Sequence, residues 1–134
     1  MDEATVRETM ARHRERFNAR DRRGWLENLV DEPYLEEPVG SGVRYGREHF
    51  GAVFDAFHAV DRGPGTGIPE YETLIVGGSE AAVFMSGAPI DGVPGGMVEI
   101  FEIAADGRIA GARVFIDARR LPTAAASPSD PGAA

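Results

Sequence analysis

The stretch Tyr34-Leu35-Glu36-Glu37-Pro38-Val39-Gly40-Ser41-Gly42-Val43-Arg44-Tyr45-Gly46 places two carboxylates side by side, directly before a proline and a glycine-rich bend. Pro38 favours extended backbone at Glu37, and successive side chains of an extended segment point to opposite faces. Glu36 and Glu37 therefore cannot both face water if one face of this segment is covered. The pattern predicts one buried carboxylate at a strand end, a placement that chemistry uses and that stability does not require. The alternative is a loop edge at which both carboxylates are solvated.

The composition of the 134-residue chain indicates one domain, with one hydrophobic core and room for a pocket. Acidic residues outnumber basic ones 22 to 14, and the net charge of -8 disfavours binding to nucleic acid or to an anionic membrane surface. The absence of cysteine excludes disulfides, thiolate nucleophiles and sulfur metal sites. No stretch resembles a signal sequence or is long and apolar enough to span a bilayer, so a cytoplasmic location is expected.

Hydrophobic spacing predicts three helices in the first part of the chain, at residues 5–18, in a short segment capped by Asp21, and at residues 47–60. His13 lies in the apolar stripe of the first helix. The second helix is predicted to include Leu29 and Val30, with Pro33 following its end.

In the second part of the chain, the residue pattern predicts four strands joined by turns, at residues 71–76, 81–88, 97–104 and 108–117. A loop is predicted at 61–69, a longer rim loop at 89–96 and a tight Asp-Gly turn at 106–107. One domain is expected over residues 1–120 and a disordered tail over 121–134. With a short strand near Tyr34, this order predicts an α+β fold: a curved, mostly antiparallel sheet wraps around the three helices as a cone-shaped barrel that encloses an apolar pocket.

Glu99 and His13 are two further polar residues that lie among apolar residues in the predicted elements. On the strand at 97–103, Glu99 shares a face with Met97 and Phe101, whereas Glu102 lies on the other face. If helices cover one face and a second subunit covers the other, at least one of these glutamates is buried with its neutral form favoured; the alternative is a solvated acid at an edge. For His13, the alternative to a functional role is a core histidine bonded to a carbonyl.

Several segments together resemble a known family. They are residues 17–21 (Phe-Asn-Ala-Arg-Asp), 35–41 (Leu-Glu-Glu-Pro-Val-Gly-Ser), Tyr45-Gly46 and 107–113. They are similar to the ketosteroid isomerase branch of the nuclear transport factor 2-like superfamily, whose relatives include SnoaL-like polyketide cyclases and small epoxide hydrolases of polyether pathways. The resemblance implies a cone-shaped α+β barrel with a deep apolar pocket, usually a homodimer, that acts on a small apolar molecule without a metal or organic cofactor.

Carried onto this sequence, the resemblance puts the catalytic base at Glu37, a protonated strand acid at Glu99 and a helix-one hydrogen-bond donor at His13. All three positions hold a residue type different from the family pattern. The implied reaction is proton abstraction next to a carbonyl in a steroid- or polyketide-like substrate, where Glu37 moves the proton and Glu99 and His13 donate to the enolate oxygen. We expect the pocket lining to include Phe54, Met85, Met97, Phe101 and Ile116.

Two other functions use the same pocket. In epoxide opening, Glu37 activates a water or hydroxyl nucleophile, and Glu99 or His13 protonates the leaving oxygen. In a non-catalytic binding module, the pocket holds a lipid or other small molecule and no reaction follows. Metal binding by His13, Glu37 and Glu99 would require the three side chains to converge on one point.

Overall fold

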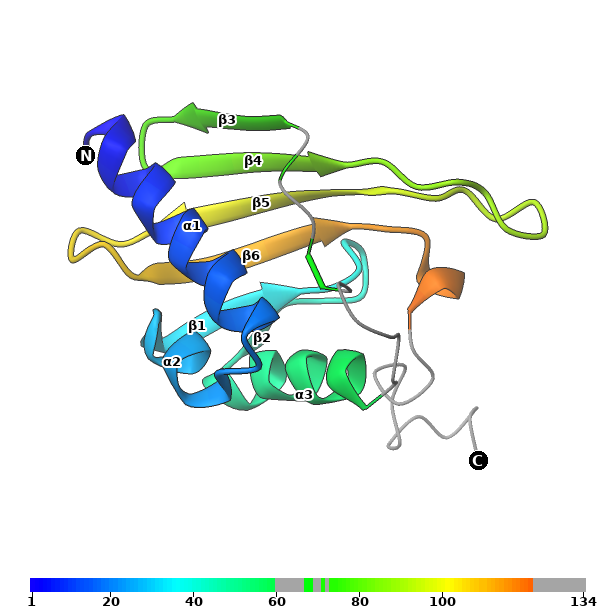
Figure 1. Cartoon of the computed structure of the whole chain (residues 1–134), viewed down its shortest axis with the longest axis horizontal. Helices are drawn as coiled ribbons and strands as arrows, with labels where there is room; N and C mark the ends of the chain where they lie inside the picture. Colours follow the sequence, from blue (N-terminus) through cyan, green and yellow to red (C-terminus); the bar gives the residue numbers. More distant parts are fainter. Residues whose placement is uncertain (60–66, 69–70, 72, 122–134) are drawn as a thin grey trace.

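Three helices lie along one face of a curved six-stranded sheet (Figure 1). The computed structural model describes residues 1–59, 67, 68, 71 and 73–121. In chain order the elements are α1 (Glu3–Asn18), α2 (Arg22–Glu27), β1 (Leu29–Glu36), β2 (Arg44–Tyr45), α3 (Arg47–His58), β3 (Thr73–Gly77), β4 (Glu80–Met85), β5 (Met97–Ile103), β6 (Ile109–Phe115) and a 3-10 turn, η1 (Ala118–Arg120).

The strands follow the order β2-β1-β6-β5-β4-β3. Every neighbouring pair is antiparallel except β1 and β6, which run parallel with Leu35 opposite Ala112. Because β2 and β3 lie at the two edges and do not pair with each other, the sheet is an open cone and not a closed barrel. The predicted α+β class and the curved, mostly antiparallel sheet are confirmed.

Helix α1 crosses the concave face of the sheet (Figure 1). It begins at the N-cap Asp2, whose carboxylate accepts a hydrogen bond from the Thr5 N–H at 2.7 Å. The apolar stripe predicted from the sequence is buried, including Val6, Met10 and His13. The stripe thus holds a histidine in the core, directly above the sheet.

The prediction for the second helix was wrong at its C-terminal end. Asp21 caps α2 as expected, through a 2.9 Å bond from the Gly24 N–H, but the helix ends at Glu27. Leu29 is the first residue of β1, and the preceding carbonyl, of Asn28, accepts from the Ile109 N–H at 2.8 Å. Pairing with a distant strand therefore overrides the local helical spacing.

Pro33 lies inside β1 and is fully buried, and does not mark the end of a helix. A proline has no N–H for the ladder, and the β1–β6 register shifts between Leu29 and Tyr34. Beyond the shift, Tyr34 packs over Gly111 on β6, where a side chain would overlap the tyrosine ring. The register shift near Pro33 and the space over Gly111 thus allow β1 to pair with β6 as far as Glu36.

The predicted strand at 81–88 is shorter, because β4 ends at Met85. The rim loop forms a narrow extension beyond β4 and β5, where Ile90 and Val93 form an isolated bridge near the tip (Figure 1). The predicted turn at 106–107 is present, with Gly107 at a φ of 84°. Except for Gly67, Ile68 and Leu121, the predicted loop at 61–69 and the predicted tail at 121–134 lie outside the described residues. No helix in the described part of the chain has the length and apolarity needed to cross a membrane.

Candidate active site

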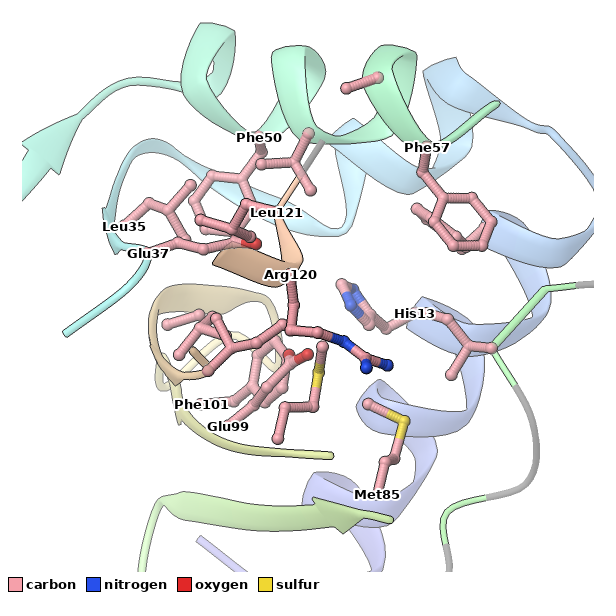
Figure 2. Close-up of a pocket in the computed structure, with 18 of the residues that line it drawn as sticks. His13, Leu35, Glu37, Phe50, Phe57, Met85, Glu99, Phe101, Arg120 and Leu121 are labelled. Carbon is pink, nitrogen blue, oxygen red and sulfur yellow. The ribbon is translucent and has the colours of Figure 1, made fainter. Parts of the chain in front are cut away.

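A cavity of about 380 Å³ lies between the helices and the concave face of the sheet. Its wall is mostly apolar, and its polar side chains include His13, Glu37, Glu99 and Arg120 (Figure 2). This volume is in the range of pockets that enclose small ligands. Its apolar side chains come from helices, strands and connecting segments: Phe17, Trp25, Leu35, Phe50, Val53, Ala56, Phe57, Ile68, Met85, Met97, Phe101, Ala112, Val114, Ile116 and Leu121.

Glu36 and Glu37 lie on opposite sides of the sheet. Glu37 follows directly after β1 and lines the cavity, and burial raises the pKa of its carboxyl. Glu36 instead accepts a bond from the Gly40 N–H at 3.0 Å and lies 3.4 Å from the Arg113 Nε. The Gly40 N–H and the Arg113 guanidinium lower the pKa of Glu36. The alternation of an extended chain therefore separates one stabilised anion from one acid in apolar surroundings.

Glu99 lies in the middle of β5, opposite Val83 on β4 and Val114 on β6. Its pKa is raised to about 8, first by burial and then by the charge of Glu37. Because the negative charge of Glu37 raises the pKa of Glu99, Glu37 ionises first. The cavity therefore pairs a carboxyl group that ionises first with one that keeps its proton up to about pH 8, the combination that general acid–base catalysis needs.

His13 enters the cavity from α1, on the helix side, while Glu37 and Glu99 come from the sheet side (Figure 2). Its side chain is buried, and burial lowers its pKa to about 4, so the imidazole is neutral. Within the described residues Nδ1 has no hydrogen-bond partner, and the ring packs 5.2 Å from the Trp25 ring and 5.1 Å from the Phe101 ring. His13 is neither the imidazolium that a carboxylate partner would favour nor a histidine bonded through Nδ1 to a carbonyl.

Four of the five residues predicted to line the pocket do so, namely Met85, Met97, Phe101 and Ile116. Phe54 does not. It is buried behind the wall, where its ring packs 5.3 Å from both the Phe17 and Trp25 rings. The described residues hold no group of three His, Asp or Glu side chains close enough to bind a metal ion, so His13, Glu37 and Glu99 do not converge on one point.

Solved structures resemble this chain, although no protein-family model and no curated protein sequence matches it. The epoxide hydrolase/cyclase-like enzyme SalBIII, which has a role in pyran ring formation in the polyether salinomycin, is 24% identical with a TM-score of 0.63, over 90% of this chain and 97% of its own. A SnoaL-like protein of unknown function from Burkholderia thailandensis is 21% identical with a TM-score of 0.66, over 87% and 98%. The fold is SnoaL-like, of the nuclear transport factor 2-like kind. A proposed polyketide cyclase from Pseudomonas putida shares this fold at 18% identity, with a TM-score of 0.64 over 86% of this chain and 92% of its own.

The sequence analysis gave no role to Arg120, which lines the cavity, or to Tyr71, which is close enough to Glu99 for the charge of Glu99 to raise its pKa. Arg120 follows the last strand and was placed at the boundary of the tail, where no periodicity is present to assign it a face. Tyr71 lies where the strand β3 was expected to start, and its hydroxyl donates to the Met10 carbonyl at 3.4 Å. Burial and the charge of Glu99 raise the pKa of Tyr71, which therefore stays a neutral phenol.

Proposed function

We propose that this protein is a cofactor-independent acid–base enzyme acting on a small, mostly apolar, polyketide-like molecule. The observation that carries the proposal is the pairing of Glu37 and Glu99 in one apolar cavity, with Glu37 ionising first and Glu99 retaining its proton at neutral pH. A base and an acid with separated pKa values in one site can remove a proton from one atom and deliver another nearby.

The reaction that we infer is epoxide opening by a hydroxyl group of the same substrate, or by water. Glu37 takes the hydroxyl proton while that oxygen attacks an epoxide carbon. The carbon–oxygen bond of the epoxide breaks, and the leaving oxygen takes the proton of Glu99. The Glu37 proton then returns to Glu99 and restores the starting state. The fold shared with an epoxide hydrolase/cyclase-like enzyme supports this reaction over others that need an acid and a base.

Isomerisation next to a carbonyl is the second candidate, because residues 35–41 resemble a segment that the isomerase branch shares with the polyether branch. Here Glu37 removes and returns a carbon-bound proton, while Glu99 and the neutral His13 donate hydrogen bonds to the enolate oxygen. This reaction needs a hydrogen bond from Glu99 but no proton transfer. The two candidates therefore require different chemistry from the same carboxyl group.

The test is turnover of two substrate panels, epoxy-alcohols in ¹⁸O-labelled water and β,γ-unsaturated cyclic ketones in deuterated water. A cyclic ether, or a diol carrying ¹⁸O, identifies epoxide opening, whereas a conjugated ketone carrying deuterium identifies isomerisation. We expect Glu37→Gln to reduce turnover by about a thousandfold, and the matched variant Glu36→Gln, on the other side of the sheet, to change it by less than about twofold. Turnover that survives in Glu37→Gln, or binding of both panels without any product, would contradict the proposal; the second outcome would leave a binding module.

We also propose that the chain forms a homodimer through the convex face of the sheet. Cross-strand neighbours Phe84, Val98 and Phe115 form an apolar row there, and Ile75 and Ile100 belong to the adjacent row. Ile75 is 62% exposed, and Phe84 and Phe115 are each 45% exposed. The second row continues to Arg113, whose guanidinium lies over the Phe115 ring, so the face combines apolar side chains with one cation at its border. Exposed apolar residues grouped in this way mark an interaction surface.

A further inference from the structure

Arg120 is the one guanidinium among the described residues that line the cavity. It belongs to η1, after β6, and its side chain extends into the cavity between His13 and Met85 (Figure 2). The surrounding wall is mostly apolar, whereas Arg120 itself is half-buried and its hydrogen bond to Ala88 lies at an exposed position. The guanidinium therefore lies where the apolar cavity meets solvent, a place suited to the polar end of a ligand whose apolar part is enclosed.

The backbone around Arg120 is held by its neighbours. The Arg120 N–H donates to the Asp117 carbonyl at 2.8 Å, and the Leu121 N–H donates to the Ala118 carbonyl at 3.2 Å. The Arg120 Nη1 donates to the carbonyl of Ala88 at 3.2 Å, which connects the turn to the base of the β4–β5 extension. The position of the guanidinium is therefore defined before a ligand binds, which reduces the entropy cost of binding.

The nearest acid in sequence is already used by another arginine. Asp117 accepts from the Arg119 N–H at 3.0 Å, from Arg119 Nε at 2.9 Å and from Arg119 Nη2 at 2.7 Å. Arg119 is accordingly the main reason why the pKa of Asp117 is lowered to about 2. Arg119 itself points away from the cavity, with 65% of its side chain exposed.

Among the described residues Arg120 forms no salt bridge, although its charge also lowers the pKa of Asp117, after the larger effect of Arg119. The Ala88 carbonyl occupies one of the five N–H donors of the guanidinium, and a carbonyl does not neutralise its charge. The pKa of Glu99 responds to burial and to Glu37, so Arg120 does not act as its counter-ion. A planar guanidinium with free donors matches the two oxygens of a carboxylate.

We propose that Arg120 binds a carboxylate group of the substrate, and that the natural substrate is an apolar carboxylic acid. The acid end would contact Arg120, and the reacting end would lie between Glu37 and Glu99; only this second placement rests on the proposed function. Arg120 would then determine which end of the molecule reaches the proton-transfer pair. It is a specificity residue and takes no part in proton transfer.

The experiment measures binding without catalysis, through the fluorescence of Trp25, the single tryptophan of the chain, which lines the cavity. The probes are cyclohexylbutyrate and cyclohexylbutyramide, which have the same apolar body and differ in charge. At neutral pH we expect the wild type to bind the carboxylate about tenfold more tightly than the amide, because hydrogen bonds to a charged group are the stronger kind. Arg120→Gln should lose this preference, Arg120→Lys should keep part of it, and the matched control Arg119→Gln should keep all of it.

Carboxylate binding that is no tighter than amide binding in the wild type, or a preference that persists in Arg120→Gln, would overturn the inference. The thermal midpoint of each variant shows that the comparison is made on folded protein. Failure here can be told apart from failure of the proposed function. A carboxylate preference that depends on Arg120, in a protein with no turnover, would support the acid site alone; Glu37-dependent turnover with no such preference would support the reaction alone.

Discussion

Glu99 and Glu102 lie three residues apart on β5 and face opposite sides of the sheet. On the concave side, burial and Glu37 raise the pKa of Glu99 to about 8. On the convex side, Glu102 shares its row with Glu80 of β4 and with Gly111 of β6. Glu36 and Glu37 at the end of β1 also face opposite sides of the sheet, and their pKa values are shifted in opposite directions. The side of the strand that an acid occupies, and not its residue type, therefore decides whether it lies in the cavity, where burial raises its pKa.

The largest expected effect is on turnover, when the acid on the concave side of β5 and the acid on its convex side are replaced in turn. Glu99→Gln keeps a hydrogen-bond donor in the cavity but removes the transferable proton, so epoxide opening should slow by about 10² to 10⁴-fold. The matched change on the convex side, Glu102→Gln, should alter turnover by less than about twofold. Wild-type turnover should also fall as pH rises through about 8, where Glu99 loses its proton. Glu99→Gln that retains most of its activity would favour the isomerisation mechanism, in which an amide N–H can still stabilise the enolate.

A second prediction compares the two sides of β5 through the pH dependence of the free energy of unfolding. Between pH 6.5 and 8 the folded state keeps Glu99 protonated, whereas in the unfolded chain this carboxyl titrates near its ordinary pKa of 4.5. Unfolding therefore releases a proton, and the free energy of unfolding should fall as pH rises, with a slope that approaches about 1.4 kcal/mol per pH unit. His13, with its pKa lowered from 6.5 to about 4, contributes the opposite slope, but only below pH 6.5.

Urea unfolding of the wild type, Glu99→Gln and Glu102→Gln across this pH window measures the effect. Glu99→Gln should remove the slope, because its amide does not titrate. Glu102→Gln should keep it. A slope that is equal in all three proteins would mean that Glu99 titrates in the folded state as an ordinary carboxyl.

The smallest effect concerns association at the convex face. Phe84→Lys adds a charge to the apolar row and should weaken dimerisation at least tenfold, because an unpaired charge would be buried in the contact. Ile90→Lys is the control, since Ile90 is 59% exposed but lies in the β4–β5 extension. Sedimentation should give a dimer for the wild type and Ile90→Lys and a monomer for Phe84→Lys. A monomeric wild type would remove the dimer from the proposed function.

Local patterns in the sequence were sufficient for much of the fold. The stripe of α1, the Asp21 cap and the turn at 106–107 depend on residues that are close in sequence, and the structure has all three. The extent of β1 depends on β6, some distance along the chain, and helical spacing at Leu29 and Val30 contains no information about that partner.

The same distinction applies to the site. Periodicity and a family resemblance selected His13, Glu37 and Glu99, and all three line one cavity, although their catalytic roles stay predictions. Phe54 has the same helical spacing as its neighbours on α3, and this spacing cannot separate the cavity wall from the core behind it. Arg120 lies after the last strand, where its direction is set by η1 and by the carbonyl of Ala88.

Because β1 pairs in parallel with β6, the cavity cannot close until late in the synthesis of the chain. Glu37 is synthesised early, but its strand finds its ladder partner only when residues 109–115 have emerged. Contacts between segments this distant close late in folding, after the local hairpins and helices. A nascent chain that stops before β6 can contain Glu37, Glu99 and His13, and still have no enclosed cavity in which a base and an acid act together.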